Sequence, residues 1–84
     1  MQPQPKTIHI QYYAALREQR KCREETVNTS AVTPLELYKE LKTQHKFTLA
    51  ENVLRVAIND EFKDWTTPLQ SGDRIVFIPP VAGG

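Results

Sequence analysis

Apolar and polar positions first alternate along Thr7–Tyr13. The apolar members Ile8, Ile10 and Tyr12 share one face, because side chains of an extended segment point to opposite faces in turn. The stretch is therefore predicted to form the first strand. A second, edge-like strand is predicted over Glu24–Thr29, where the pattern is weaker.

Helical composition marks two further stretches of the first half. Ala14–Lys21 favours a short helix or helical turn with Leu16 as its inward anchor. A stronger helix is predicted over Pro34–Gln44, because Thr33 stands at the N-cap, proline follows it and glutamate comes three residues after the cap. The apolar stripe of this helix consists of Leu37, Tyr38 and Leu41.

The second half of the chain contains three more predicted strands. They are Val53–Ile58, Glu61–Trp65 and Arg74–Ile78. Asn59 and Asp60 give a hairpin turn signal between the first two, since both residue types tolerate positive φ. The preceding connection, Lys46–Asn52, is predicted to insert Phe47 and Leu49 into the core.

This order of elements predicts a fold class. The first and last strands can lie side by side and parallel, with the main helix over one face and any crossover right-handed. The expected fold is α+β, of the β-grasp, ubiquitin-like type, with a mixed sheet of about five strands and a central last strand. Residues 7–78 are assigned to this domain, residues 1–6 to a disordered lead and residues 79–84 to a protruding tail.

Composition narrows the class of protein. The 84 residues fit one domain with a modest core, and hydrophobic and charged fractions of 39% and 25% are ordinary for a soluble domain. The net charge of +1 gives no field that favours nucleic acid or membrane as a partner. No stretch approaches the roughly 20 apolar residues of a membrane span, and none follows the start as a signal peptide would, so a cytoplasmic location is expected.

The chain ends in RIVFIPPVAGG, which we interpret as a presented C-terminus. Pro79 and Pro80 stop the sheet, because a proline nitrogen cannot donate to the ladder, and they favour an extended path. Residues 79–84 span roughly 20 Å when extended, which suits insertion into a pocket on a partner. Gly83 and Gly84 fit a narrow channel and leave the terminal carboxylate open to conversion into an acyl-adenylate. A frayed terminus is the alternative interpretation.

Three segments together resemble the small, sulfur-carrying subunit of molybdopterin synthase: YYAALRE near the start, SGDRIVFIPP and the final PPVAGG. The resemblance extends from about Thr7 to Gly84 and implies a β-grasp fold. Members of that family are adenylylated at the last glycine by an activating enzyme that consumes ATP, and are then converted to a C-terminal thiocarboxylate. Their tail enters the large synthase subunit, where sulfur passes to a cyclic pterin precursor in molybdenum cofactor biosynthesis.

The resemblance implies roles for the residues of the tail. Gly84 carries the acyl-adenylate and later the thiocarboxylate. The inserted segment consists of Gly83, Ala82, Val81, Pro80 and Pro79. The catalytic groups belong to the large subunit, so this chain alone is not an enzyme. The domain itself binds no cofactor, and ATP is used by the activating enzyme, since the sequence lacks a phosphate-binding glycine loop. The implied partners are the large subunit in a heterotetramer, an adenylyltransferase of the ubiquitin-activating type and a sulfurtransferase donor.

Three residues are candidates for the interface with a partner, and Trp65 is a weaker fourth. Phe62 follows the hairpin turn and fits an exposed aromatic anchor, and Ile78 is a second candidate. For both residues a position in the core remains an open alternative. Arg17 resembles a family position near the interface, with a solvated arginine as its alternative. Trp65 is expected to lie in the core.

Other reactive side chains receive no role. Cys22 has no second cysteine, which excludes an internal disulfide and a cysteine-rich zinc site. His9 and His45 lie far apart in sequence without metal-ligand spacing, so no metal is expected.

Three other functions remain open at this point. Ala82 stands where the family commonly has a hydroxyl residue, which leaves room for a sulfur carrier that serves thiamine or cysteine synthesis. A ubiquitin-like modifier, joined through Gly84 to lysines of target proteins, is an alternative of a different class. The third is a β-grasp binding module whose tail has no role.

Overall fold

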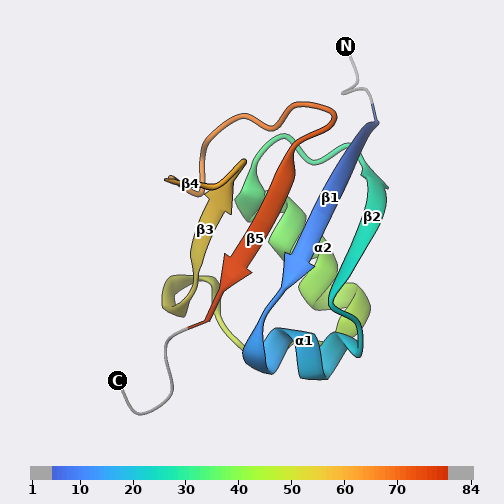
Figure 1. Ribbon diagram of the computed structural model, residues 1–84, viewed down its shortest axis with the longest axis vertical. Helices are drawn as coiled ribbons and strands as arrows, with labels where there is room; N and C mark the ends of the chain where they lie inside the picture. The colour runs from blue at the N-terminus through green and yellow to red at the C-terminus, as the bar shows by residue number, and fades with distance from the viewer. Residues whose placement is uncertain (1–4, 80–84) are drawn as a thin grey trace.

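The computed structural model describes residues 5–79 of the chain, which form one sheet with two helices (Figure 1). The order of elements is β1 (Lys6–Tyr12), α1 (Ala14–Arg20), β2 (Glu24–Thr29), α2 (Pro34–His45), a 3-10 turn (Glu51–Val53), β3 (Arg55–Ile58), β4 (Glu61–Lys63) and β5 (Arg74–Ile78). The strand order across the sheet is β2-β1-β5-β3-β4. The sheet is mixed, since β1 and β5 are parallel and the other neighbours are antiparallel. The β-grasp prediction is confirmed, and β5 is the central strand.

The helix α2 begins where the sequence predicts. Thr33 accepts a hydrogen bond on its hydroxyl from the backbone N–H of Glu36, at 3.3 Å. The Glu36 carboxylate accepts in turn from the N–H of Val32, at 3.2 Å. The first bond satisfies a backbone donor that the first helical turn leaves unpaired, and the second ties the residue before the N-cap to the helix. The helix ends with Lys46 in the left-handed region at φ 57°, and it extends one residue beyond the predicted end at Gln44.

Helix α2 lies across one face of the sheet, and the core fills the space between them (Figure 1). The period-two pattern of β1 buries Ile8, Ile10 and Tyr12, as predicted. Phe47 is buried and Leu49 packs against the core, so the predicted role of their connection is confirmed. The centre of the core consists of the side chains of Leu16, Leu37, Tyr38, Leu41, Val56, Ile75 and Phe77.

Two strands in the second half are shorter than predicted. β3 begins at Arg55 rather than Val53, because Glu51–Val53 forms a 3-10 turn. β4 ends at Lys63 rather than Trp65, because the chain turns inward there. The indole of Trp65 stacks on the Phe77 ring with centroids 5.8 Å apart, and its carbonyl accepts from the N–H of Leu35, at 3.1 Å. Packing against the core thus ends the strand and confirms the core assignment of Trp65.

The first strand is shifted by one residue. It begins at Lys6 and ends at Tyr12, because Tyr13 serves as the N-cap residue of α1. Helix α1 lies at the end of the sheet where β1 and β5 finish (Figure 1). Within residues 5–79, neither helix is long and apolar enough to span a membrane.

Candidate functional site

Most of the predicted tail lies outside the described residues. Pro80, Val81, Ala82, Gly83 and Gly84 belong to this part of the chain, so their roles in insertion and chemistry stay predictions. Pro79 is described and is buried, although it follows the last residue of β5.

The end of β5 is a firm base for the residues that follow it. Tyr12 of β1 pairs with Phe77 on one side, and Arg55 of β3 pairs with Ile78 on the other. The Phe77 side chain is fully buried and packs on the rings of Tyr38 and Trp65. Pairing on both sides already fixes the conformation of β5, so the strand loses little further conformational entropy when the segment after it docks on a partner.

The face of the sheet opposite α2 carries a row of apolar side chains. The alternation that buries Ile75 and Phe77 turns Val76 and Ile78 to this opposite face. Gln11, Val76, Ala57 and Phe62 then lie in register across β1, β5, β3 and β4. We name Val76, Ala57, Phe62 and Ile78 the free-face patch.

The exposure of the free-face patch falls toward its middle. Phe62 at its edge is 65% exposed, whereas Val76 and Ala57 are only 8% exposed, although no described helix lies over them (Figure 1). Ile78 is half-buried. The structure therefore brings two predicted interface residues, Phe62 and Ile78, onto one face, and neither belongs to the core that α2 covers. An exposed aromatic ring beside closely packed apolar side chains, here those of Val76 and Ala57, is typical of a protein-binding surface.

Arg55 is a member of this site that the sequence analysis missed. Its guanidinium lies over the Phe62 ring, 5.8 Å from the centroid, which is cation–π geometry. Its strand partner in the register is Ile78. The signal in the sequence was the alternation within RVAI, which sends Arg55 and Ala57 to the face opposite Val56 and Ile58.

Arg17, the third predicted interface residue, lies apart from the free-face patch. It is exposed on α1, at the end of the molecule where β5 finishes (Figure 1). Its backbone carbonyl accepts from the N–H of Lys21, at 2.8 Å, which closes the helix. Arg17 thus stands near the base of the tail rather than beside Phe62.

A hydrogen-bonded cluster attaches α1 to the sheet. Arg20 donates to both carboxylate oxygens of Glu25, at 2.8 and 2.9 Å, and Tyr12 donates its hydroxyl to the same carboxylate at 2.5 Å. The hydrogen bond from Arg20 holds the pKa of the Glu25 carboxyl below its ordinary value. Burial, and then the bond to Glu25, raises the pKa of Tyr12. The three side chains bond to one another and are at most partly exposed, so we assign the cluster a structural role.

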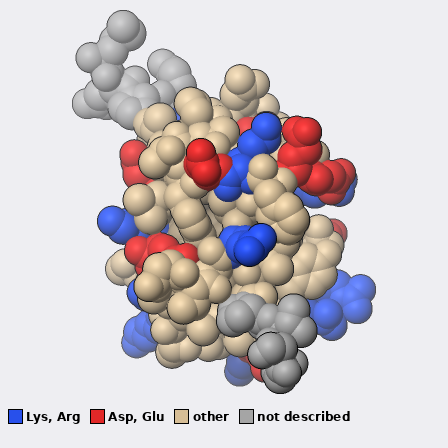
Figure 2. Space-filling model, turned by 90° about the vertical axis from the view of Figure 1, so that its left-hand side faces the viewer, with Lys and Arg blue, Asp and Glu red and all other residues tan. Residues whose placement is uncertain are grey.

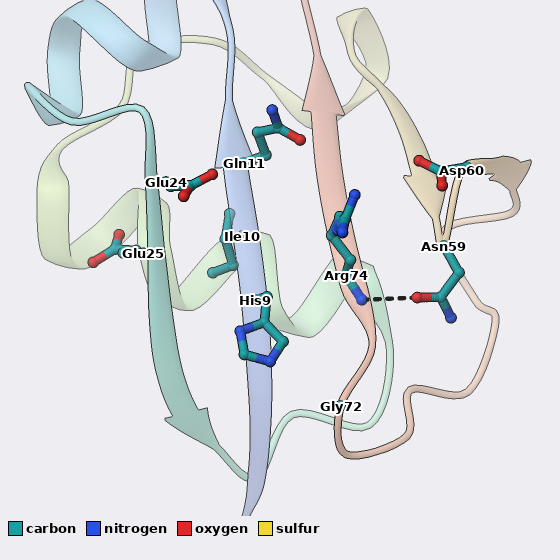
Figure 3. A pocket seen from close by; sticks show the side chains of 9 residues that line it. All are labelled: His9, Ile10, Gln11, Glu24, Glu25, Asn59, Asp60, Gly72 and Arg74. Carbon is teal, nitrogen blue, oxygen red and sulfur yellow. Dashed lines mark hydrogen bonds between the residues drawn. The ribbon is translucent and has the colours of Figure 1, made fainter.

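A depression of about 540 Å³ lies near the start of β5, on the face of the sheet opposite α2 (Figure 3). The charged and polar residues that line it are His9, Gln11, Glu24, Glu25, Asn59, Asp60 and Arg74. The imidazole of His9 lies 3.0 Å from the hydroxyl of Thr26, its register partner in β2. The depression mixes both signs of charge and lies at the opposite end of β5 from Ile78. It therefore adds no catalytic group to the base of the tail.

The structure also shows the surroundings of the cysteine and histidine side chains that received no role from the sequence. Within residues 5–79, no three His, Cys, Asp or Glu side chains come together in a group that would hold a metal ion. Cys22 is a free, half-buried thiol that packs against the core. His45 lies 3.9 Å from Glu25 and 5.7 Å, between ring centroids, from Phe47, as part of the packing around α2.

Comparisons with known proteins agree on one family. The model of the ThiS family matches residues 10–84. The human molybdopterin synthase sulfur carrier subunit is 32% identical over 82 residues, which cover 92% of this chain and 93% of the human protein.

Solved structures show the same fold. A chain in the complex of subunits 1 and 2 of molybdopterin-converting factor from Helicobacter pylori is 28% identical, with a TM-score of 0.63 over 93% of this chain and 99% of that one. The small archaeal modifier protein 1 from Haloferax volcanii has a TM-score of 0.74 over 90% of this chain and 99% of its own, but at 20% identity it shows the fold alone. The family match and the human relative together establish that this chain belongs to the ThiS family.

Proposed function

We propose that this chain is the sulfur carrier subunit of a molybdopterin synthase. The observation that carries the proposal is the 32% identity to the human subunit of that name, spread over 92% of this chain. The family match over residues 10–84 includes both helices, strands β2 to β5 and the sequence segment that ends in Gly84. The proposed role needs a stable domain with a reactive end, and it needs no catalytic constellation on the domain itself.

The first step activates Gly84 on an adenylyltransferase that binds ATP. A carboxylate oxygen of Gly84 attacks the α-phosphorus of ATP, and pyrophosphate leaves. The product is an acyl-adenylate, whose acyl carbon is open to nucleophiles that a carboxylate repels. A hydrosulfide ion released by a donor protein then attacks that carbon, AMP leaves with the electrons of the C–O bond, and loss of the sulfur-bound proton leaves a thiocarboxylate.

The second step transfers the sulfur in the large subunit. The thiocarboxylate sulfur attacks a carbon of the pterin precursor and displaces an oxygen substituent, which leaves with the electrons of its C–O bond, so that a thioester-like bond forms. Water then attacks the acyl carbon, so the sulfur stays on the precursor and Gly84 returns to a carboxylate. Gly83 gives the clearance that this attack requires, because it has no Cβ. The acids and bases of both steps belong to the partner proteins.

The fold supports this use of the C-terminus. Residues 79–84 follow β5, the central strand, and they reach roughly 20 Å when extended. A partner that receives Gly84 at that reach must dock against the end of β5. The free-face patch begins there with Ile78 and extends to Phe62, while Arg17 stands on α1 at the same end. We propose these three residues as contacts with the large subunit, and a cytoplasmic location where ATP is supplied.

Intact mass spectrometry of the purified protein tests the proposed chemistry. The chain is incubated with ATP, the adenylyltransferase of the same organism and a sulfur donor, and its mass is then compared with that of an untreated sample. The expected product has one oxygen replaced by sulfur, and fragmentation should locate the change at Gly84. A control without ATP should stay unmodified, because the carboxylate has no leaving group.

Two other results would redirect the assignment. A thiocarboxylate that forms but supports thiamine or cysteine synthesis rather than the dithiolene would keep the sulfur carrier and change the pathway. Attachment of Gly84 to lysines of other proteins, without sulfur, would instead identify a protein modifier. If neither sulfur nor conjugates appear with all components present, the proposed chemistry is wrong.

A further inference from the structure

Arg55 is the charged residue that stands within the free-face patch. Its guanidinium lies over the Phe62 ring at 5.8 Å, and its backbone pairs in register with Ile78. It therefore borders both apolar residues that we assign to the interface. A partner surface that covers the ring of Phe62 on the side of Arg55 therefore also removes water from the guanidinium.

Arg55 has no counter-charge within the described residues 5–79. The ion pairs of that region join Arg20 and His45 to Glu25, Lys42 to Glu51 and Lys63 to Glu61. Asp64 lines the same cleft of about 260 Å³ as Arg55 but forms no ion pair with it. In the free protein water solvates the exposed guanidinium, so this arrangement carries no penalty.

Docking of a partner removes water from the guanidinium of Arg55. A guanidinium that loses its water without gaining a counter-charge is strongly disfavoured, because the desolvation free energy is not returned. An apolar partner surface would give Phe62 its contact but leave this charge buried and unpaired. A carboxylate supplies two acceptor oxygens in the geometry of the guanidinium fork. The pair would also fix the orientation of the partner on the sheet.

The position of Arg55 limits which partner can meet it. The side chain stands beside Ile78, the last residue of β5, and the sequence from there to Gly84 spans roughly 20 Å when extended. Any protein that binds Gly84 in a pocket therefore approaches this corner of the sheet. Figure 2 views the side where β3 and β4 lie, and near its middle basic side chains border uncharged surface, with acidic side chains close by. A partner with an acidic group among apolar ones is complementary to such a surface.

We propose that the large synthase subunit docks on the free-face patch with an aspartate or glutamate side chain placed against the guanidinium of Arg55. This inference rests on the proposed function, which supplies the large subunit as the partner. It adds the chemistry of the contact, an ion pair at the centre of an apolar interface. Arg55 is thus a residue that decides which large subunit this chain accepts.

The test measures the dissociation constant for the large subunit of the same organism by titration calorimetry. Arg55→Met keeps the aliphatic cover on Phe62 and removes the charge, and it is expected to weaken binding by on the order of 30-fold or more. Arg55→Glu should abolish detectable binding, and exchange of the facing carboxylate of the partner for arginine should restore it. Lys39→Met, on the exposed side of α2, is the matched control and should leave the constant unchanged.

The outcomes separate this inference from the proposed function. If Phe62→Ala weakens binding but Arg55→Met binds as tightly as the native chain, the large subunit does dock on the free-face patch. The proposed ion pair between Arg55 and a carboxylate of the partner is then wrong. If Arg55→Met affects only the adenylyltransferase, or only self-association measured by ultracentrifugation, a different occupant meets Arg55 and the inference is overturned. If the native chain does not bind the large subunit, both fall, while the mass measurement on Gly84 still tests the sulfur chemistry. Thermal unfolding of each variant shows that the fold is intact.

Discussion

Tyr12, at the end of β1, donates its hydroxyl hydrogen bond to the carboxylate of Glu25 in β2, at 2.5 Å. The same carboxylate accepts two bonds from Arg20, so strand β1, strand β2 and helix α1 meet at one acidic group. The Glu25 side chain is 18% exposed, which protects these bonds from competition by water. The position of α1 at the base of the tail therefore depends on the ionisation of one carboxyl.

Replacement of that carboxyl should destabilise the protein in a pH-dependent way. The pKa of Glu25 is lower in the folded chain than its ordinary value of 4.5, chiefly because of the bond from Arg20. Its contribution is therefore present above pH 4.5 and is lost as the pH falls through the folded pKa. Glu25→Gln should lower the free energy of unfolding by about 1.5–3 kcal/mol at pH 7. The difference from the native chain should shrink toward pH 3 in urea unfolding.

The matched control is Glu18→Gln, on the exposed side of α1. Its effect should stay within about 0.5 kcal/mol at both pH values. Equal effects of the two substitutions would contradict the special role of Glu25.

The N-cap of α2 should contribute measurably to stability. Thr33→Ala removes the hydroxyl that accepts from the N–H of Glu36, so we expect a loss of about 1 kcal/mol in thermal or urea unfolding. Thr33→Ser keeps that acceptor and should retain most of the native stability. A stability of Thr33→Ala equal to that of the serine variant would show that the cap bond contributes nothing.

Phe62 should matter for binding and not for folding. Its ring is 65% exposed, so Phe62→Ala should change the free energy of unfolding by no more than about 0.5 kcal/mol. The affinity for the large subunit should fall by roughly 30-fold, as expected for an aromatic anchor. Phe77→Ala is the contrasting variant, because its buried ring should cost about 3–5 kcal/mol of stability. A large stability loss from Phe62→Ala would place the ring in the core instead.

The last residue should be essential for chemistry and dispensable for folding. One alanine appended after Gly84 moves the reactive carboxylate away from its proposed position, so sulfuration and cofactor synthesis should stop. The strands and helices are formed by residues 6–78, so the melting temperature should stay unchanged. Ala82→Thr introduces the hydroxyl common in the family and should remain active. Full cofactor synthesis by the extended chain would remove Gly84 from the mechanism.

The sequence predicts best where a local rule determines the structure. The cap residues around Thr33 predict the start of α2, and the alternation around Ile8 and Ile10 predicts which face of β1 is buried. Periodicity fails at Trp65, where packing on Phe77 draws the chain out of the predicted strand. Competition between a strand and a core contact is a tertiary effect that no local pattern reveals.

The candidate site is predictable only in part for a similar reason. Phe62 follows a recognisable turn, and the strand pattern suggests Ile78. Their union on one face, with Arg55 between them, depends on the registers of β3 with β4 and β5. A register shift of one residue would send each side chain to the other face, so the site appears only once the sheet is assembled.

Asn59 is the residue that holds the β3–β4 turn against β5. Its backbone lies in the left-handed region at φ 53°, its side-chain oxygen accepts from the N–H of Arg74 at 3.0 Å, and its amide nitrogen donates to Asp73 at 3.0 Å. Asn59→Gly loses both side-chain bonds but keeps the backbone conformation, so we expect a stability loss of about 1–2 kcal/mol. Asn59→Ala loses the same bonds and adds the strain of a Cβ at positive φ, which should cost about 1 kcal/mol more. Urea unfolding of both variants separates the contribution of the side-chain bonds from that of the backbone strain. Equal stability of the glycine and alanine variants would show that a Cβ at this positive φ adds no strain. A glycine variant as stable as the native chain would show that the bonds to Arg74 and Asp73 do not fix this turn.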